Sequence, residues 1–182
     1  MTDPVPVRLT VNGDQRRAVV EPRKTLADVL REDLALTGAK TVCREGFCGA
    51  CLVLMDDRPV ASCLTPIAAA QGRAIRTIES LGAGEELSPL QTSLAEHDVV
   101  QCGMCFPGMV ITLTSFLAAN PEPTRTEVKQ ALVGNICRCT GYERIIDAVL
   151  AHAQAAAKLD ATRGAGAASA PSPLVGEGRG GG

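Results

Sequence analysis

The stretch that decides the fold runs from Gln101 to Gly141 and carries a pair of cysteines near each end. It opens Gln101-Cys102-Gly103-Met104-Cys105-Phe106-Pro107-Gly108 and closes Gly134-Asn135-Ile136-Cys137-Arg138-Cys139-Thr140-Gly141. Between these ends lie an apolar run and a second helix-forming segment, which together predict a helical hairpin. Folding of this hairpin would bring four thiolates onto one inorganic centre.

A second set of cysteines lies upstream, and the two sets account for all 8 cysteines of the chain. Four thiolates per site is the ligand set of a [2Fe–2S] cluster, so we expect two such clusters. The upstream spacing C-x4-C-x2-C, with a fourth cysteine further on, is typical of plant-type ferredoxins. In that loop, Gly46 and Gly49 are expected to turn backbone N–H groups towards the anionic cluster, and Arg44 to add positive charge. The predicted ligands of this first quartet are Cys43, Cys48, Cys51 and Cys63.

The second quartet combines a C-x2-C with a C-x-C step, which lets two thiolates reach a compact centre from one turn. Pro107 and Thr140 are expected to start helices beside it, so that two helix dipoles favour the anionic cluster. Arg138 is either a charge that tunes the cluster or a solvated side chain. The 2 histidines of the chain lie away from both quartets, which excludes a Rieske-type centre. The predicted ligands are Cys102, Cys105, Cys137 and Cys139.

The composition excludes some classes of function and indicates where the protein is located. The chain has 182 residues, 46% of them hydrophobic and 21% charged, and its net charge of −2 gives no basic surface for nucleic acid. No secretion leader is visible and the apolar part of residues 99–121 is too short to span a membrane. We therefore expect a cytoplasmic protein, or a periplasmic one if a partner carries it through export. Eight cysteines in this setting favour metal over disulfides.

Periodicity predicts an α+β fold with a β-grasp domain at residues 1–81 and a four-helix domain at residues 82–159. A Gly-, Ala-, Ser- and Pro-rich tail at residues 160–182 is expected to be disordered. Asn12-Gly13 predicts the first hairpin turn, and Thr25 is the expected N-cap of the first helix. Predicted strands are 5–11, 18–20, 52–55, 60–64 and 74–78. Two helices are predicted at residues 26–34 and 107–117. Another is predicted to start at Ser88-Pro89 with a capping box, and one to run from Thr124, paired with Glu127, to Gly134. A last helix is predicted to be opened by Thr140 with Glu143.

Taken together and in this order, the two quartets resemble the iron–sulfur subunit of the molybdenum hydroxylases, the xanthine oxidase family. This family includes aldehyde oxidoreductases and aerobic carbon monoxide dehydrogenases. The resemblance covers roughly residues 5–155 and rests on both cysteine motifs and on their neighbours Gln101, Pro107-Gly108-Met109 and Gly141-Tyr142. Two departures stand out: Met104 occupies a position where Tyr is common, and Phe106 one where a small hydroxyl residue is common.

The resemblance implies an electron-transfer subunit with no substrate chemistry of its own. A large partner subunit would hold a molybdopterin cofactor, and a medium subunit with FAD, or a cytochrome, would accept the electrons. The helical-domain cluster would lie nearest the molybdenum site. Gln101 and Cys139 would contact the pterin, so that Cys139 would be both a ligand and the point where electrons enter.

Two other readings remain open on the residues alone. A free two-cluster ferredoxin would carry the same ligands, although diffusible carriers usually show a stronger surface charge than −2. A zinc-stabilised adaptor is the other, since C-x2-C is common in zinc sites, but the C-x4-C step fits zinc poorly.

Overall fold

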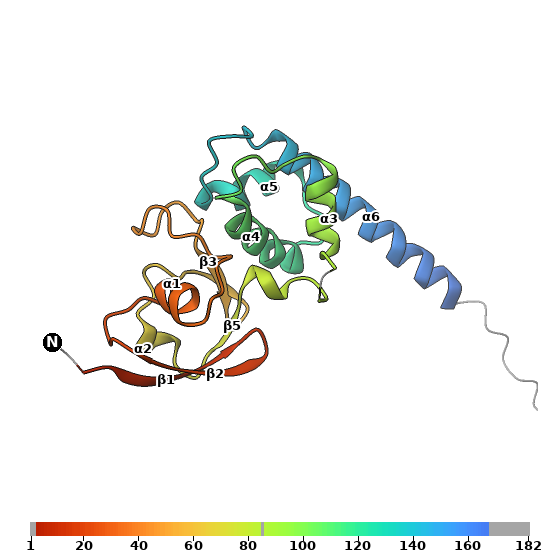
Figure 1. Ribbon diagram of the computed structural model, residues 1–182. Helices are drawn as coiled ribbons and strands as arrows, with labels where there is room; N and C mark the ends of the chain where they lie inside the picture. Colours follow the sequence, from red (N-terminus) through yellow and green to blue (C-terminus); the bar gives the residue numbers. More distant parts are fainter. Residues whose placement is uncertain (1–2, 85, 168–182) are drawn as a thin grey trace, which may run out of the picture.

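The structure, a computed structural model, describes residues 3–84 and 86–167 and contains a five-stranded sheet (Figure 1). The strands lie in the order β2-β1-β5-β3-β4, and β1 with β5 is the parallel pair among antiparallel ones. The longer helices follow the sheet in the chain instead of alternating with its strands, which confirms the predicted α+β class. The strands are β1 Val5–Val11, β2 Asp14–Val20, β3 Leu52–Met55, β4 Arg58–Ala61 and β5 Ala74–Arg76.

Both predicted hairpins form. Asn12 and Gly13 have φ angles of 54° and 87°, the left-handed values that a tight two-residue turn between antiparallel strands requires. Residues 56–57, which join β3 to β4, are left-handed as well. Strand β2 begins at Asp14, earlier than the predicted Ala18, because backbone pairing with β1 continues through residues whose polar side chains are exposed.

Helix α1 (Leu26–Asp28) continues as the π-helix η1 (Val29–Asp33) and lies beside the sheet (Figure 1). Thr25 begins it with a capping box: its hydroxyl accepts from the Asp28 N–H at 3.3 Å, and the Asp28 carboxylate accepts from the Thr25 N–H at 3.4 Å. A short helix, α2 (Ile67–Ala70), was not predicted. The core of this half contains Val7, Leu9, Val11, Val20, Leu26, Val29, Leu30, Ala39, Val53, Ile67, Ala70 and Ile75.

Cys63 does not lie on a strand, contrary to the prediction. Strand β4 ends at Ala61, and Cys63 is in the turn that follows. Ser62 explains the early end, because its hydroxyl donates to the Cys51 carbonyl at 2.6 Å. Its own carbonyl accepts from the Ala27 N–H at 3.1 Å. These bonds turn the chain away from the sheet and towards the first cysteine loop.

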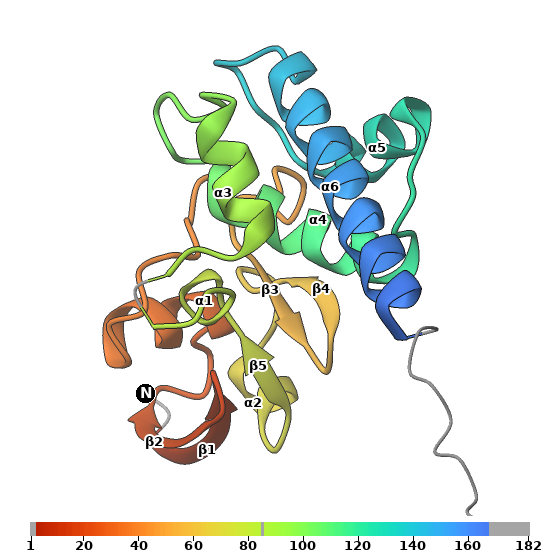
Figure 2. The same cartoon turned by 90° about the vertical axis from the view of Figure 1, so that its right-hand side faces the viewer.

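Four α-helices follow the sheet in the described part of the chain, and Figure 2 shows them gathered to one side of it. Ser88 with Gln91 and Thr124 with Glu127 form the predicted capping boxes of α3 and α5. A second core lies between the helices and includes Leu90, Leu94, Met109, Val110, Leu113, Val128, Ile145, Ile146 and Val149. The helices are η2 Ile78–Ser80, α3 Pro89–Glu96, α4 Phe106–Ala119, α5 Arg125–Ala131, η3 Leu132–Gly134 and α6 Glu143–Ala167.

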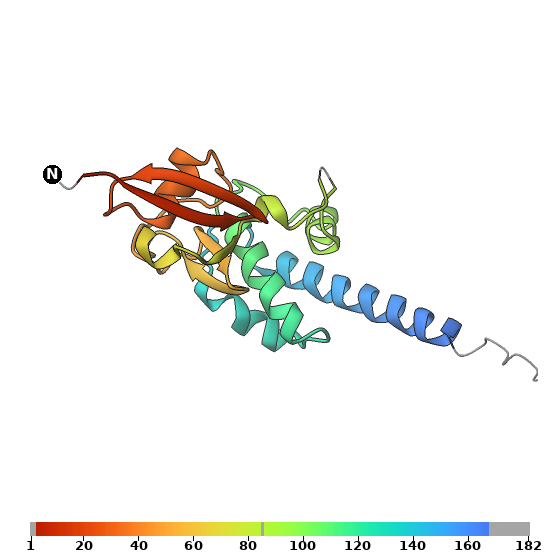
Figure 3. The ribbon, with the colours of Figure 1, turned by 90° about the horizontal axis from the view of Figure 1, so that it is seen from below.

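Helix α6 is longer than predicted and extends beyond the rest of the molecule (Figures 1 and 3). It continues to Ala167, so residues 160–167 are helical where a disordered tail was expected to begin. The alanines before and within this segment are strong helix formers, which explains the continuation. The rest of that predicted tail, residues 168–182, lies outside the described residues. Among the described helices, none has the length and apolar character needed to cross a membrane.

Helix α4 packs on β3 and β4 and joins the helical half to the sheet. Near its start, Gly108 lies so close to the first cysteine loop that an added Cβ would overlap the Gly49 carbonyl oxygen. A Cβ on Gly49 would in turn overlap the Gly134 carbonyl oxygen. Backbone therefore meets backbone at this contact, and only glycine permits the approach.

We expect Gly108→Ala to destabilise the protein by about 3 kcal/mol, because the new methyl group meets rigid backbone that cannot move aside cheaply. Urea unfolding of the iron-loaded full chain measures the change. Gly134→Ala is the matched control, since an added Cβ there has no atom within 4 Å. Equal stability of the two variants would contradict the close contact.

Candidate metal centres

The first quartet is held by one loop and one turn beside the sheet. Cys43, Cys48 and Cys51 lie on the loop between η1 and β3, and Cys63 lies in the turn after β4. All four thiols are free, and all except Cys43 are buried. The Cys43 thiol is in hydrogen-bond contact with Cys48, and Cys51 with Cys63. The structure therefore brings the four predicted ligands together as two pairs.

Backbone donors face sulfurs of this loop, from Glu45 and from Gly46, one of the two glycines predicted to supply them. The Glu45 N–H donates to Cys43 Sγ at 3.4 Å, and this bond, with further ones from Cys48, lowers the pKa of Cys43 to about 6. Burial raises the pKa of Cys63 to about 11, although the Gly46 N–H opposes that shift. The loop thus stabilises negative charge on one sulfur before any metal binds, which suits an anionic cluster.

Arg44 does not serve the cysteines in the way the sequence predicted. Its guanidinium Nη1 lies 3.0 Å from Asp28 Oδ1, a carboxylate at the start of α1. The guanidinium that was expected to face the cluster is thus paired with a carboxylate, whereas backbone N–H groups of Glu45 and Gly46 are directed at the sulfurs.

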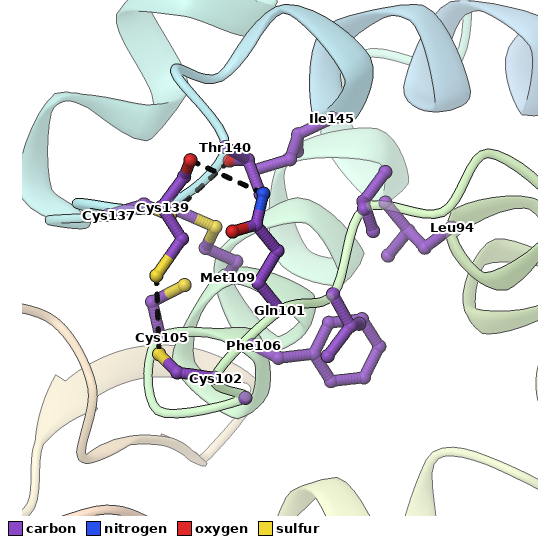
Figure 4. A pocket seen from close by; sticks show the side chains of 13 residues that line it. Leu94, Gln101, Cys102, Cys105, Phe106, Met109, Cys137, Cys139, Thr140 and Ile145 are labelled. Atoms are coloured by element: carbon purple, nitrogen blue, oxygen red, sulfur yellow. Dashed lines mark hydrogen bonds between the residues drawn. The ribbon is translucent and has the colours of Figure 1, made fainter.

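The second quartet comes from two loops at one end of the helices (Figure 4). Cys102 and Cys105 lie in the loop before α4, and Cys137 and Cys139 lie between η3 and α6. The Cys139 thiol donates to Cys102 Sγ at 3.5 Å, and Cys105 and Cys137 form the other contact pair. Cys102 and Cys139 are exposed, whereas the other two are half-buried. Arg138 is exposed between the two cysteines that flank it.

The four thiols of the second quartet are electrostatically unequal. Burial raises the pKa of Cys105, the residue that directly precedes α4, to about 12. Burial also opposes ionisation of Cys137, but hydrogen bonds from Thr140 outweigh it and lower the pKa. The Met104 N–H lowers the pKa of Cys102. Negative charge is thus favoured on one sulfur of each contact pair.

The predicted start of the last helix is wrong in its details. Thr140 and Glu143 do not form a capping pair; α6 begins at Glu143, whose carboxylate bonds to Arg125 instead. Thr140 Oγ1 accepts from the Tyr142 N–H at 3.4 Å and lies 3.3 Å from Cys137 Sγ. The hydroxyl is therefore directed towards a predicted ligand and not towards the helix.

Tyr142 fixes the loop that carries Cys137. Its hydroxyl accepts from the Cys137 N–H at 2.8 Å and donates to the Asn135 carbonyl at 2.8 Å. Tyr142 has a φ of 70°, which is uncommon for a bulky residue. The sequence analysis named Tyr142 only as part of the second cysteine motif. Its position close to a cysteine pair, as a lone tyrosine, was the available signal.

The predicted pterin contact Gln101 donates to the Cys139 carbonyl at 3.3 Å and so ties the two cysteine loops together.

The two quartets are joined through backbone. The Ile136 N–H donates to the Cys48 carbonyl at 2.9 Å. Asn135 is buried, and its side-chain amide approaches the Gly49 carbonyl at 3.5 Å. A predicted ligand of the first quartet is thus hydrogen-bonded to the residue that precedes Cys137, a predicted ligand of the second.

The pairing of the thiols is compatible with a dinuclear cluster. A [2Fe–2S] cluster spreads its four thiolates over two irons. Each quartet likewise contains two close pairs of thiols.

Two family models match the chain, and together they cover both quartets. Residues 9–76 match a 2Fe-2S iron-sulfur cluster binding domain, and residues 77–150 match a [2Fe-2S] binding domain. The chain is 51% identical over 149 residues to the nicotine 6-hydroxylase small subunit of Paenarthrobacter nicotinovorans, covering 82% of this chain and 90% of that one. This chain belongs to the family of iron–sulfur subunits of the molybdenum hydroxylases.

Other relatives of this iron–sulfur subunit agree. The caffeine dehydrogenase subunit gamma of Pseudomonas sp. (strain CBB1) is 41% identical, over 79% of this chain and 87% of that one. The crystal structure of quinoline 2-oxidoreductase from Pseudomonas putida 86 contains a chain that superposes with a TM-score of 0.82 at 48% identity, covering 86% of this chain and 98% of that chain. The chain is therefore the iron–sulfur subunit of an oxidoreductase complex.

Replacing Tyr142 by Phe removes one hydroxyl and leaves the Cys137 N–H and the Asn135 carbonyl without their partner. We expect a loss of about 1–3 kcal/mol in stability and faster removal of iron from the second quartet by a chelator. Thr112→Val is the control, because the Thr112 hydroxyl is buried without a hydrogen-bond partner. Iron release at the same rate in both variants would show that Tyr142 does not hold the loop.

Proposed function

We propose that this subunit carries two [2Fe–2S] clusters and passes electrons from a molybdopterin site in a large partner subunit to FAD, or another acceptor, in a further subunit. The observation that carries the proposal is the hydrogen bond from the Ile136 N–H to the Cys48 carbonyl. It places the two quartets in bonded contact through one peptide. Such closeness suits electron transfer between two clusters.

The cluster assignment follows the contact pairs. In each quartet, the two thiolates of a pair are proposed to share one iron. In the second quartet, the pair formed by Cys102 and Cys139 is exposed and would face the molybdopterin subunit. Gln101, bonded to the Cys139 carbonyl, would contact the pterin at this edge. The proposed ligands are Cys43, Cys48, Cys51 and Cys63 for the first cluster and Cys102, Cys105, Cys137 and Cys139 for the second.

The bound clusters would supply one-electron transfer, and the chain would hold them and control the charge around them. The Glu45 and Gly46 N–H groups offset negative charge at the first quartet. Burial of three of its cysteines keeps water from that site. The Gln101 side chain joins the two loops of the second quartet, and the Tyr142 side chain fixes the loop that carries Cys137. Residues 1–81 would form the ferredoxin-like β-grasp domain and residues 82–159 the four-helix cluster domain.

Metal and sulfide analysis tests the cluster count. The anaerobically prepared full chain should contain about four iron and four acid-labile sulfides, as two [2Fe–2S] clusters require. In electron paramagnetic resonance, Cys48→Ser and Cys137→Ser should each abolish or alter a different one of two reduced-state signals. Tightly bound zinc without sulfide would refute the proposal, and recovery of the native protein without larger subunits would favour a free carrier.

The pterin contact is tested with Gln101→Ala in the assembled complex. We expect both clusters to be retained, but reduction of the second cluster by substrate should be slower, because an amide that orients Cys139 and contacts the pterin is lost. Rapid-freeze spectroscopy at matched iron and molybdenum content measures the rate. Gln130→Ala, at an exposed position on α5, is the control. Equal rates in the two variants would leave Gln101 with a structural role alone.

A further inference from the structure

We propose that Thr140 is a positioning residue whose hydroxyl donates a hydrogen bond to Cys137 Sγ and thereby raises the reduction potential of the second cluster. The inference rests on the proposed function, because it requires a cluster on this quartet. It adds a role for a residue that is not among the predicted ligands. The observation behind it is the distance of 3.3 Å between Thr140 Oγ1 and Cys137 Sγ.

The direction of this hydrogen bond follows from the neighbouring atoms. Thr140 Oγ1 already accepts from the Tyr142 N–H at 3.4 Å, so its single proton remains available for another acceptor. A metal-bound cysteine is a thiolate and has no proton to donate. The hydroxyl must therefore be the donor, and the sulfur the acceptor, whenever a cluster is bound.

The surroundings of Thr140 favour the sulfur over water as the acceptor. The small space into which Thr140 faces is lined largely by apolar side chains, among them Leu94, Met109 and Ile145 (Figure 4). Thr140 itself is half-buried. A hydroxyl proton in this space gains most by bonding to an anionic sulfur, because hydrogen bonds to charged acceptors are stronger than neutral ones.

Neighbouring bonds hold the sulfur in place for Thr140. The Cys137 N–H is bound by the Tyr142 hydroxyl, so the backbone of this cysteine cannot rotate freely. Tyr142 thus acts twice: its side chain fixes Cys137, and its N–H fixes Thr140. Within the described residues, Thr140 supplies the side-chain hydroxyl bonded to a predicted ligand sulfur.

The effect on potential follows from charge. Reduction adds one electron to the cluster, no bond forms or breaks, and the hydroxyl keeps its proton. The added negative charge spreads to the ligand sulfurs and strengthens a hydrogen bond that points at one of them. Hydrogen bonds to the sulfurs are among the factors that set cluster potentials. The reduced state is therefore stabilised more than the oxidised state, which raises the potential.

The test is a redox titration of the anaerobic, iron-loaded full chain, monitored by electron paramagnetic resonance of both clusters. Thr140→Val keeps the shape and removes the hydroxyl, and should lower the potential of the second cluster. A tenfold change in the one-electron equilibrium corresponds to 59 mV, and we expect a shift of about this size. Thr140→Ser should restore the wild-type value. The first cluster should be unchanged in all variants.

Thr112→Val controls for exchanging a hydroxyl for a methyl group elsewhere in the helical half and should shift neither potential. An unchanged second potential in Thr140→Val, or an equal shift in Thr140→Ser, would overturn the inference while leaving the proposed function intact. If Thr140→Val binds less iron, Thr140→Ala is titrated instead. Loss of the cluster in both would mean that the hydroxyl serves assembly and would overturn the inference. Wild-type protein without a second cluster would overturn the proposed function as well.

Discussion

The hydrogen bond between the Ile136 N–H and the Cys48 carbonyl links two parts of the chain that each form a cysteine site. The first site depends on a loop beside a sheet, and the second on two loops at the ends of helices. Neither loop has regular secondary structure to hold its sulfurs. Each loop is kept in place partly by the other, because the bond joins Cys48, a predicted ligand, to the residue that precedes Cys137, another predicted ligand. The geometry of one centre therefore depends on the geometry of the other.

The positions of the glycines follow from this contact. The loop around Cys48 approaches the start of α4 and the end of η3 at backbone distance, which leaves no room for a Cβ on Gly49 or Gly108. In the second quartet side chains hold the loops, since Gln101 joins the two loops and Tyr142 fixes the one that carries Cys137.

Local sequence signals predicted the elements well where the signal is itself a local interaction. The Asn12-Gly13 turn, the N-cap at Thr25, the capping box at Ser88 and the helix start at Thr124 are confirmed, because each depends on residues within one turn. Errors arose where a distant partner decides. Ser62 ends β4 through bonds to Cys51 and Ala27, which no local pattern reveals.

The same distinction applies to the site. Cysteine spacing predicted the members of each quartet, and the structure places them on neighbouring loops and turns. The sequence could not reveal that Arg44 pairs with Asp28, or that the Thr140 hydroxyl contacts Cys137 instead of capping α6. Charged and hydroxyl side chains choose among several partners, and the choice depends on tertiary distances that one sequence does not contain.

The contact of Gly49 with Gly108 has a consequence for recombining this subunit with its relatives. The two family models divide the chain between residues 76 and 77, as though each half were a separate module. The contact crosses that border, with Gly49 in one half and Gly108 and Gly134 in the other. A chimera that takes its halves from two different proteins inherits two surfaces that were shaped by different neighbours. Substitutions in the first loop are thus constrained by residues far along the chain, and the halves must change together.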